Sequence, residues 1–123
     1  MPDEKEIIQI FDRGGVKLAR VRSDSILQES EVESFGRALI ALAEVPGTRV
    51  VLSFLGVRQL TSLVLGKLIL AHKRLVESGG ELRLADIDPH IYEMFAITHL
   101  DRLFRIFERE DEAIASYHAA PEA

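Results

Sequence analysis

The chain has 123 residues, no cysteine and a formal net charge of −5, and 47% of its residues are hydrophobic. This length suits one domain with one core, and the apolar content is too high for a disordered chain. The acidic balance argues against a nucleic-acid-binding protein, and the lack of cysteine excludes disulfides, thiolate nucleophiles and thiolate metal sites.

The first residues, "MPDEKE", are acidic and polar, unlike the basic start and apolar core of a signal peptide. The apolar stretch from Leu63 to Leu70 is interrupted by Gly66 and Lys67, so it is too short to cross a bilayer. We therefore expect a soluble, cytoplasmic protein with no membrane segment. It should form a single domain over residues 1–123, with a core of about 5–118 and a frayed tail "AAPEA".

The segment "EIIQIFDRGGVKLARVR" predicts two strands joined by a turn. Its apolar residues fall into two groups on either side of Asp12 to Gly15, which supplies the turn because glycine accepts a positive φ. The first group is Ile7, Ile8, Ile10 and Phe11, and the second is Val16, Leu18 and Val21.

The segment "SEVESFGRALIALAE" predicts a helix over residues 30–44, because its apolar residues recur near one face. Ser30 and Glu33 have the spacing of a capping box at its start. The sequence "VPG" should end this helix. The β-branched run "TRVVLSF" then predicts a strand buried on both faces, at the centre of a sheet.

Two adjacent hydroxyls, Thr61 and Ser62, precede an apolar run from Leu65 to Val76 with helical spacing. Serine and threonine are both favoured helix N-caps, because their hydroxyl accepts a backbone N–H. Either Thr61 caps the helix and leaves Ser62 free, or the reverse. The sequence "SGG" should end this helix with Gly79 or Gly80 in the left-handed conformation.

The last third of the chain continues the alternation of strands and helices. A strand is predicted at "ELRLAD", followed by a helix that Asp88 caps and Pro89 begins. A short strand at "LFRIF" and a helix at "EDEAIASYHA" complete the pattern. This order predicts an α/β fold: a mixed, mainly parallel sheet of about five strands, with an N-terminal antiparallel hairpin and about four helices. Sites in such sheets lie beyond the carboxyl ends of the strands, where Thr61 and Ser62 fall.

Three blocks make the chain resemble a STAS domain, the module of bacterial anti-sigma-factor antagonists and of sulfate-transporter tails. They are "VVLSFLGVRQLTSLVLGKLI", "HKRLVESGGELRLADIDPHIYEMF" and "ITHLDRLFRIF", and the resemblance covers nearly the whole chain. In the family, Asp-Ser-Ser-Gly-Leu-Gly opens a helix after a strand that ends near Gly-Val. The matching positions are Gly56-Val57, Ser62, Leu65-Gly66, Gly79-Gly80 and the run from Leu100 to Phe104.

In switching members of this family, a partner kinase phosphorylates the serine after the aspartate. The unphosphorylated form binds the anti-sigma factor, which is often that same kinase. The resemblance therefore implies phosphorylation at Ser62, with Thr61 as the second candidate. Thr61 stands in place of the aspartate, Leu63 of the second serine and Val64 of a glycine, and Gln28 stands where the first loop usually carries an aspartate. Two acids usual at the switch surface are thus missing.

The implied function is that of a STAS-type anti-sigma-factor antagonist or signalling module. Its partner would be an anti-sigma factor or serine kinase, with a serine phosphatase as a further partner. The expected partner-binding residues are Gln28, Thr61, Ser62, Leu63, Lys67 and Tyr92. The alternative is a STAS scaffold or oligomerisation module that is never phosphorylated, which leaves a homo-oligomer open.

An enzyme is the competing class of function. Ser62 lacks the Gly-x-Ser-x-Gly elbow of hydrolases, and the chain has no phosphate-binding loop and no metal motif. We therefore expect no catalytic residue, no cofactor and no metal. His72, on the apolar stripe of its helix, is expected to be partly buried and hydrogen-bonded.

Overall fold

A computed structural model describes residues 6–118. Most of the acidic start and the tail predicted to fray lie outside the described residues. The elements, in chain order, are β1 (Ile8–Arg13), β2 (Val16–Val21), β3 (Ser25–Ile26), α1 (Glu29–Ala41), η1 (Leu42–Glu44), β4 (Arg49–Ser53), β5 (Gln59–Leu60), α2 (Ser62–Glu77), β6 (Glu81–Ala85), α3 (Pro89–Ile97), η2 (Leu100–Arg102), β7 (Ile106–Phe107) and α4 (Glu110–His118).

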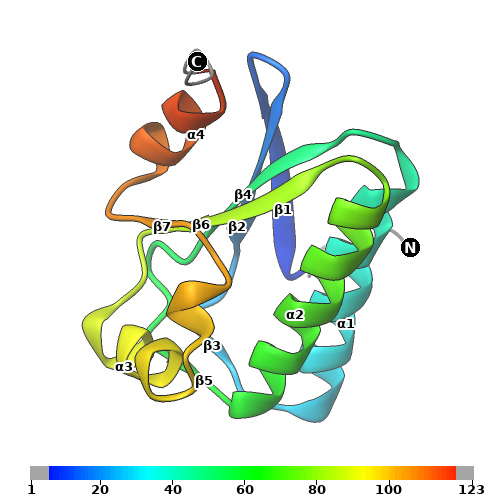
Figure 1. The fold of residues 1–123 in the computed structure, drawn as a ribbon. Helices are drawn as coiled ribbons and strands as arrows, with labels where there is room; N and C mark the ends of the chain where they lie inside the picture. Colours follow the sequence, from blue (N-terminus) through cyan, green and yellow to red (C-terminus); the bar gives the residue numbers. More distant parts are fainter. Residues whose placement is uncertain (1–5, 119–123) are drawn as a thin grey trace.

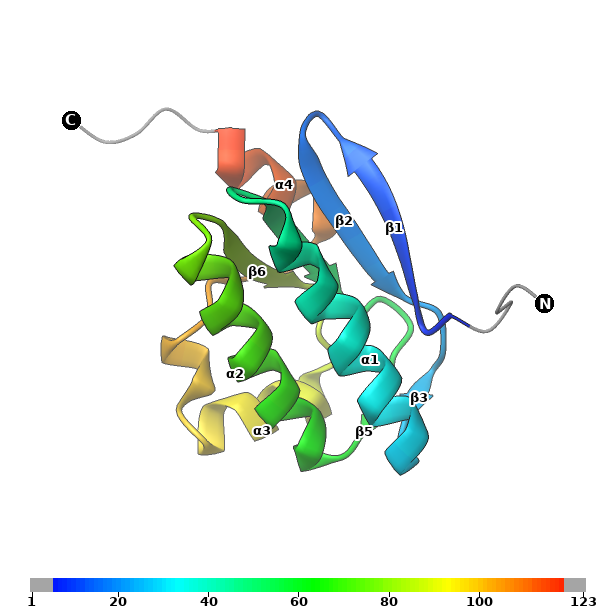
Figure 2. The same ribbon diagram turned by 90° about the vertical axis from the view of Figure 1, so that its right-hand side faces the viewer.

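The main sheet has five strands in the order β1-β2-β4-β6-β7. Strands β1 and β2 are antiparallel, and the other pairs are parallel. Helices α1 and α2 lie side by side on one face, and α4 packs on the other (Figures 1 and 2). This confirms the predicted α/β fold. It also confirms the buried central strand, because β4 is the middle strand and residues 50–54 are all buried.

The larger core lies between the sheet and helices α1 and α2. A row of aromatic rings extends it towards α3. The Phe54 ring is 6.5 Å from that of Phe95, which is 6.4 Å from that of Phe104, both edge to face. All three rings are buried. Burial of side chains of this size contributes about 2 to 3 kcal/mol each, so this row ties α3 to the end of the central strand.

The predicted turn and two of the predicted helix boundaries are confirmed. The carboxylate of Asp12 accepts the N–H of Gly15 at 3.0 Å in the hairpin turn. The carboxylate of Asp88 accepts the N–H of His90 at 2.9 Å and caps α3. Gly79 has a φ of +89° after α2, and the N–H of Gly80 reaches back to a carbonyl of the helix.

Two predictions about local structure were wrong, and two short strands were missed. Helix α1 begins at Glu29, one residue before the predicted start, so Ser30 and Glu33 lie inside it and form no capping box. The strand predicted at 103–107 is only Ile106–Phe107, because Phe104 turns into the core. Strands β3 and β5 were not predicted, since two residues are too few to show a period.

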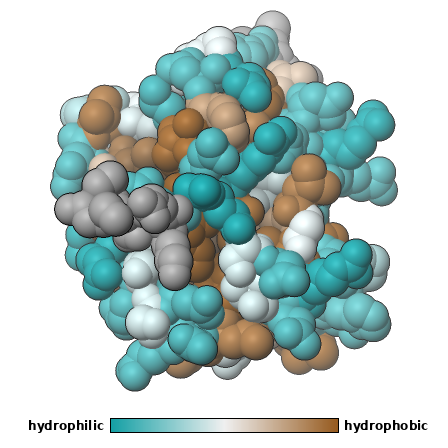
Figure 3. All heavy atoms as spheres, turned by 180° about the vertical axis from the view of Figure 1, so that it is seen from behind, coloured by the Kyte–Doolittle hydropathy of each residue, from teal (hydrophilic) through white to brown (hydrophobic). Residues whose placement is uncertain are grey.

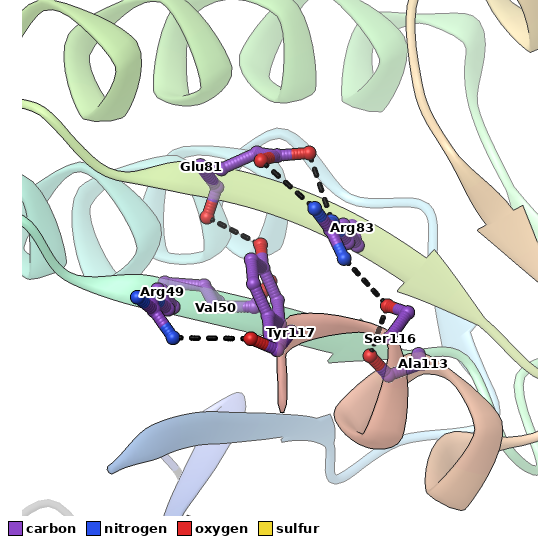
Figure 4. Close-up of polar contacts among 7 residues, drawn as sticks. All are labelled: Arg49, Val50, Glu81, Arg83, Ala113, Ser116 and Tyr117. Carbon is purple, nitrogen blue, oxygen red and sulfur yellow. Dashed lines mark hydrogen bonds and ion pairs between the residues drawn. The ribbon is translucent and has the colours of Figure 1, made fainter. Parts of the chain in front are cut away.

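Polar contacts attach α4 to the sheet (Figure 4). The hydroxyl of Tyr117 lies 2.9 Å from two carbonyl oxygens, those of Val50 in β4 and Glu81 in β6. The guanidinium of Arg83 stacks 3.9 Å from the centre of the Tyr117 ring and donates to the carboxylate of Glu81 and the hydroxyl of Ser116. The buried charge of Arg83 is therefore compensated by the Glu81 carboxylate and by the face of the Tyr117 ring, as buried charges must be.

Candidate functional site

Strands β3 and β5 bring the starts of α1 and α2 together. They pair in parallel, with Ser25 opposite Gln59 and Ile26 opposite Leu60. The N–H of Thr61 continues this pairing by donating to the carbonyl of Ile26 at 3.2 Å. Ile26 and Leu60 are buried and hold the pair against the core. Helices α1 and α2 therefore begin beside each other at the carboxyl end of the sheet (Figure 2).

The first turn of α2 separates the roles of its two hydroxyls. Thr61 is the N-cap, with extended backbone, and its Oγ1 accepts the N–H of Leu63 at 3.1 Å. Ser62 is the first residue of the helix and is exposed. Within residues 6–118, no hydrogen bond involves the Ser62 hydroxyl. Of the two arrangements left open by the sequence, the structure therefore shows the one in which Thr61 caps.

Gln28 is the N-cap of α1 and is exposed. The carboxylate of Glu31 folds back over this helix start and accepts the N–H groups of Leu27 and Gln28, each at 3.0 Å. These two hydrogen bonds lower the pKa of Glu31. The Glu31 carboxylate is therefore held in its charged form against the backbone at the start of α1.

Two exposed leucines flank this helix pair. Leu63, in the first turn of α2, is 63% exposed, and Leu27, just before α1, is 45% exposed. We call Leu27, Gln28, Thr61, Ser62 and Leu63 the helix-start surface. It combines apolar and neutral polar side chains with one free hydroxyl, a composition that suits protein recognition. Sequence reasoning missed Leu27, because a single leucine beside a predicted loop carries no periodic signal.

Lys67 and Tyr92 are not among the five residues of this surface. The Lys67 ammonium is 3.2 Å from the carboxylate of Glu33, and its stem packs against Gly36, where an added Cβ would lie 2.7 Å from Lys67 Cδ. Lys67 therefore joins α2 to α1 one turn beyond Leu63. Tyr92 is exposed on α3, and within the described part of the chain no hydrogen bond or ion pair joins it to the helix-start surface.

Other candidate side chains have structural roles. His72 is half-buried with its ring edge-on to Phe104, 5.0 Å between centres. Burial lowers the pKa of this histidine. Its Nδ1 has no hydrogen-bond partner among residues 6–118, so the predicted hydrogen-bonded histidine was wrong at that atom. No group of three or more histidine and acidic side chains in the described residues could hold a metal ion.

The first turn of α2 itself favours an anion. The first turn of α2 carries no acidic residue, and α1 carries Glu29 and Glu31 in its own first turn. Free N–H groups and the positive end of the helix dipole stabilise a negative group at such a position. The start of α2 is therefore a position at which a negative group would stabilise the helix.

Comparisons with known proteins identify the fold. A family model described as STAS domain matches residues 6–113. No protein in a curated collection matches significantly. An anti-sigma-factor antagonist (STAS) domain protein from Planctomyces limnophilus is 21% identical, with 91% of this chain and 98% of that chain covered and a TM-score of 0.83.

Two further solved structures have a similar fold. An anti-sigma factor antagonist from Mycobacterium paratuberculosis is 22% identical, with 91% of this chain and 93% of that chain covered and a TM-score of 0.79. The anti-sigma factor antagonist SpoIIAA in its unphosphorylated form is 14% identical, with 92% and 99% covered and a TM-score of 0.68. At these identities the structural matches establish the fold alone.

Proposed function

Since the chain belongs to the STAS domain family, we propose that it is a bacterial anti-sigma-factor antagonist that binds its partner through the helix-start surface. Phosphorylation of Ser62 switches this binding off. The partner is an anti-sigma factor, in the simplest case one that is itself the serine kinase, and a serine phosphatase restores the free form. The observation that carries the proposal is the exposed, uncommitted hydroxyl of Ser62 beside a neighbouring threonine that already caps the helix.

The chemistry of the surface explains how one phosphate would act. A phosphoserine carries about −1.5 to −2 charges at neutral pH. Here it would stand next to the exposed Leu63, on the surface that also presents the exposed Leu27 to a partner. Docking would then require the phosphate to lose water against an apolar contact, which is costly. The switch would therefore act by desolvation, and it would not need a carboxylate at Gln28 or Thr61.

Localisation in the cytoplasm, where sigma factors act, is part of this proposal. Within residues 6–118, no helix is long and apolar enough to cross a membrane. The shared end of α1 and α2 is open to a docking protein, because Gln28, Ser62 and Leu63 are all exposed. Lys67 and Tyr92 would contribute at the margin of the interface.

Phosphate incorporation tests the proposal. Wild-type protein, Ser62→Ala and Thr61→Ala would each be incubated with the anti-sigma kinase and ATP, and the modified peptide would be mapped by mass spectrometry. We expect phosphate on the wild type and on Thr61→Ala, and none on Ser62→Ala. Phosphate on Ser62→Ala would show that another residue is the phosphate acceptor. No phosphate on any variant, together with undiminished partner binding, would instead indicate a scaffold.

A further inference from the structure

Strand β1 is a long edge of the sheet with a free side. It has six residues and pairs with β2 on one side (Figure 2). Among residues 6–118, no strand pairs with its other side. The opposite edge, β7, has two residues. The unpaired backbone N–H and C=O groups at the edges of this sheet are therefore concentrated on β1.

The hydrogen-bonding pattern of the hairpin identifies which groups of β1 point outward. The N–H of Arg22 donates to the carbonyl of Ile7 at 2.7 Å, so Ile7 faces β2. Bonding alternates along an antiparallel strand, so the odd-numbered residues of β1 bond to β2. The N–H and C=O groups of Ile8, Ile10 and Asp12 therefore point away from the sheet.

Strand β1 lacks most of the features by which proteins usually protect an edge, and its charged residues are confined to Asp12 and Arg13 at its end. It contains no proline and no lysine, and its register with β2 is one to one, without a bulge. Its first four residues, Ile8 to Phe11, carry no charge. Ile10 is 41% exposed although it points to the same face as the buried Ile8. Figure 3 shows apolar side chains between hydrophilic ones on the side of the molecule where β1 lies.

We propose that β1 is a homodimer interface, in which a second copy of this chain adds its own β1 in the antiparallel direction. The outward residues are symmetric about Ile10. A two-fold axis there places Ile10 opposite Ile10 and Ile8 opposite Asp12, so each outward N–H and C=O meets a partner. Two five-stranded sheets would join into one continuous sheet, and the exposed part of Ile10 would be covered by its own copy.

Charge disfavours one of the two neighbouring registers. A shift of two residues also keeps each side chain on its own face. A shift towards the N-terminus, however, would place Glu6 opposite Asp12, and like charges directly opposite each other are destabilising. With Ile10 on the axis, the side chains opposite Asp12 and Arg13 are isoleucines, Ile8 and Ile7. The proposed pairing is argued from β1 alone and does not depend on the switch at Ser62.

Single cysteines test the pairing directly, because the chain has none. Opposite Cα atoms in a bonded antiparallel pair are about 5.5 Å apart, within disulfide range. Ile10→Cys should therefore form a disulfide-linked dimer quickly under mild oxidation. Gln9→Cys should not, because Gln9 faces Phe11 of the second copy. Val45→Cys, at a residue that is 66% exposed in another region, measures linking by random collision.

Sedimentation equilibrium provides the second readout. We expect the wild type to be a dimer, Ile10→Lys a monomer, and the matched control Val45→Lys a dimer, with circular dichroism showing that each is folded. A wild type that stays monomeric at all concentrations would overturn the proposal. So would equal rates of linking for Ile10→Cys and Val45→Cys, a result that holds even if Ile10→Lys fails to fold.

Discussion

The hydroxyl of Thr61 occupies the N-cap of α2 and leaves the hydroxyl of Ser62, the next residue, exposed at the first position of the helix. Thr61 accepts the N–H of Leu63 at 3.1 Å, which satisfies one of the free donors at the helix start. Capping and phosphate acceptance are therefore assigned to different residues, and each can be removed without removing the other.

This division predicts opposite behaviour in stability measurements. Thr61→Ala should lower the free energy of unfolding by about 1 kcal/mol, because the helix loses its cap. Ser62→Ala should change it by less than about 0.5 kcal/mol, as expected at an exposed site without partners. Urea denaturation of both variants checks this. A larger loss for Ser62→Ala than for Thr61→Ala would show that the caps are assigned the wrong way round.

Partner binding should depend on charge at Ser62. Ser62→Ala should keep the affinity of the wild type, because alanine adds no charge. Ser62→Asp should weaken binding, though less than phosphorylation does, since a carboxylate carries one charge rather than nearly two. The helix start tolerates this aspartate, so folding should be retained. Isothermal titration with the anti-sigma factor measures both variants.

The control for added charge is Ala115→Asp, an exposed position on α4 across the sheet. It should bind like the wild type. Equal affinities for the wild type, Ser62→Ala and Ser62→Asp would mean that Ser62 is not a switch and that the chain acts as a STAS scaffold.

Leu63 should supply apolar contact to the partner. Leu63→Ala should weaken binding about tenfold, which corresponds to about 1.4 kcal/mol and is typical of an important interface residue. Leu70→Ala is the matched control, because Leu70 is also on α2 and is 36% exposed, but lies about two turns away. Its affinity should stay within about twofold of the wild type. Equal losses in the two variants would place the interface along α2 instead.

The sequence predicted the features whose causes are local. The hairpin turn follows from Asp12 and the glycines after it, and the start of α3 follows from Asp88 and Pro89. The start of α1 was misplaced because Gln28 and Glu31 offer the same spacing as Ser30 and Glu33. Which pair is used depends on where the chain leaves β3, and that depends on pairing with β5, more than 30 residues away.

The contacts of α4 could not be predicted either. Tyr117 and Val50 are 67 residues apart in the sequence, and only the packing of α4 on the sheet brings them together. The same holds for Arg83, which reads as an exposed residue in an alternating strand but is 8% exposed beneath α4. The helix itself is encoded locally, whereas its polar partners are set by tertiary structure.

Tyr117 should stabilise the attachment of α4. Burial raises the pKa of its hydroxyl, which donates to carbonyl oxygens of β4 or β6. Tyr117→Phe should lower the free energy of unfolding by about 1 to 2 kcal/mol, because buried acceptors lose their donor. Tyr92→Phe, on the exposed side of α3, should leave stability unchanged. Chemical denaturation of both variants distinguishes the loss of the Tyr117 hydrogen bond to the sheet from a general effect of losing a tyrosine hydroxyl.

His72 should make the protein less stable in mild acid. Burial against Phe104 lowers its pKa, and the nearby Glu81 offsets this only in part. The unfolded chain takes up a proton at its ordinary pKa of about 6.5, whereas the folded protein resists protonation until a lower pH. The contribution of the neutral ring to the free energy of unfolding is therefore fully present above about pH 6.5, and is lost as the pH falls from there through the depressed pKa of the folded state.

In His72→Phe, this part of the pH dependence of stability should disappear, while the acidic groups still titrate as in the wild type. His90→Gln, at an exposed histidine, should keep the wild-type slope. Urea midpoints at several values between about pH 5 and 8 measure the difference, and identical slopes for the wild type and His72→Phe would show that burial does not hold this ring neutral.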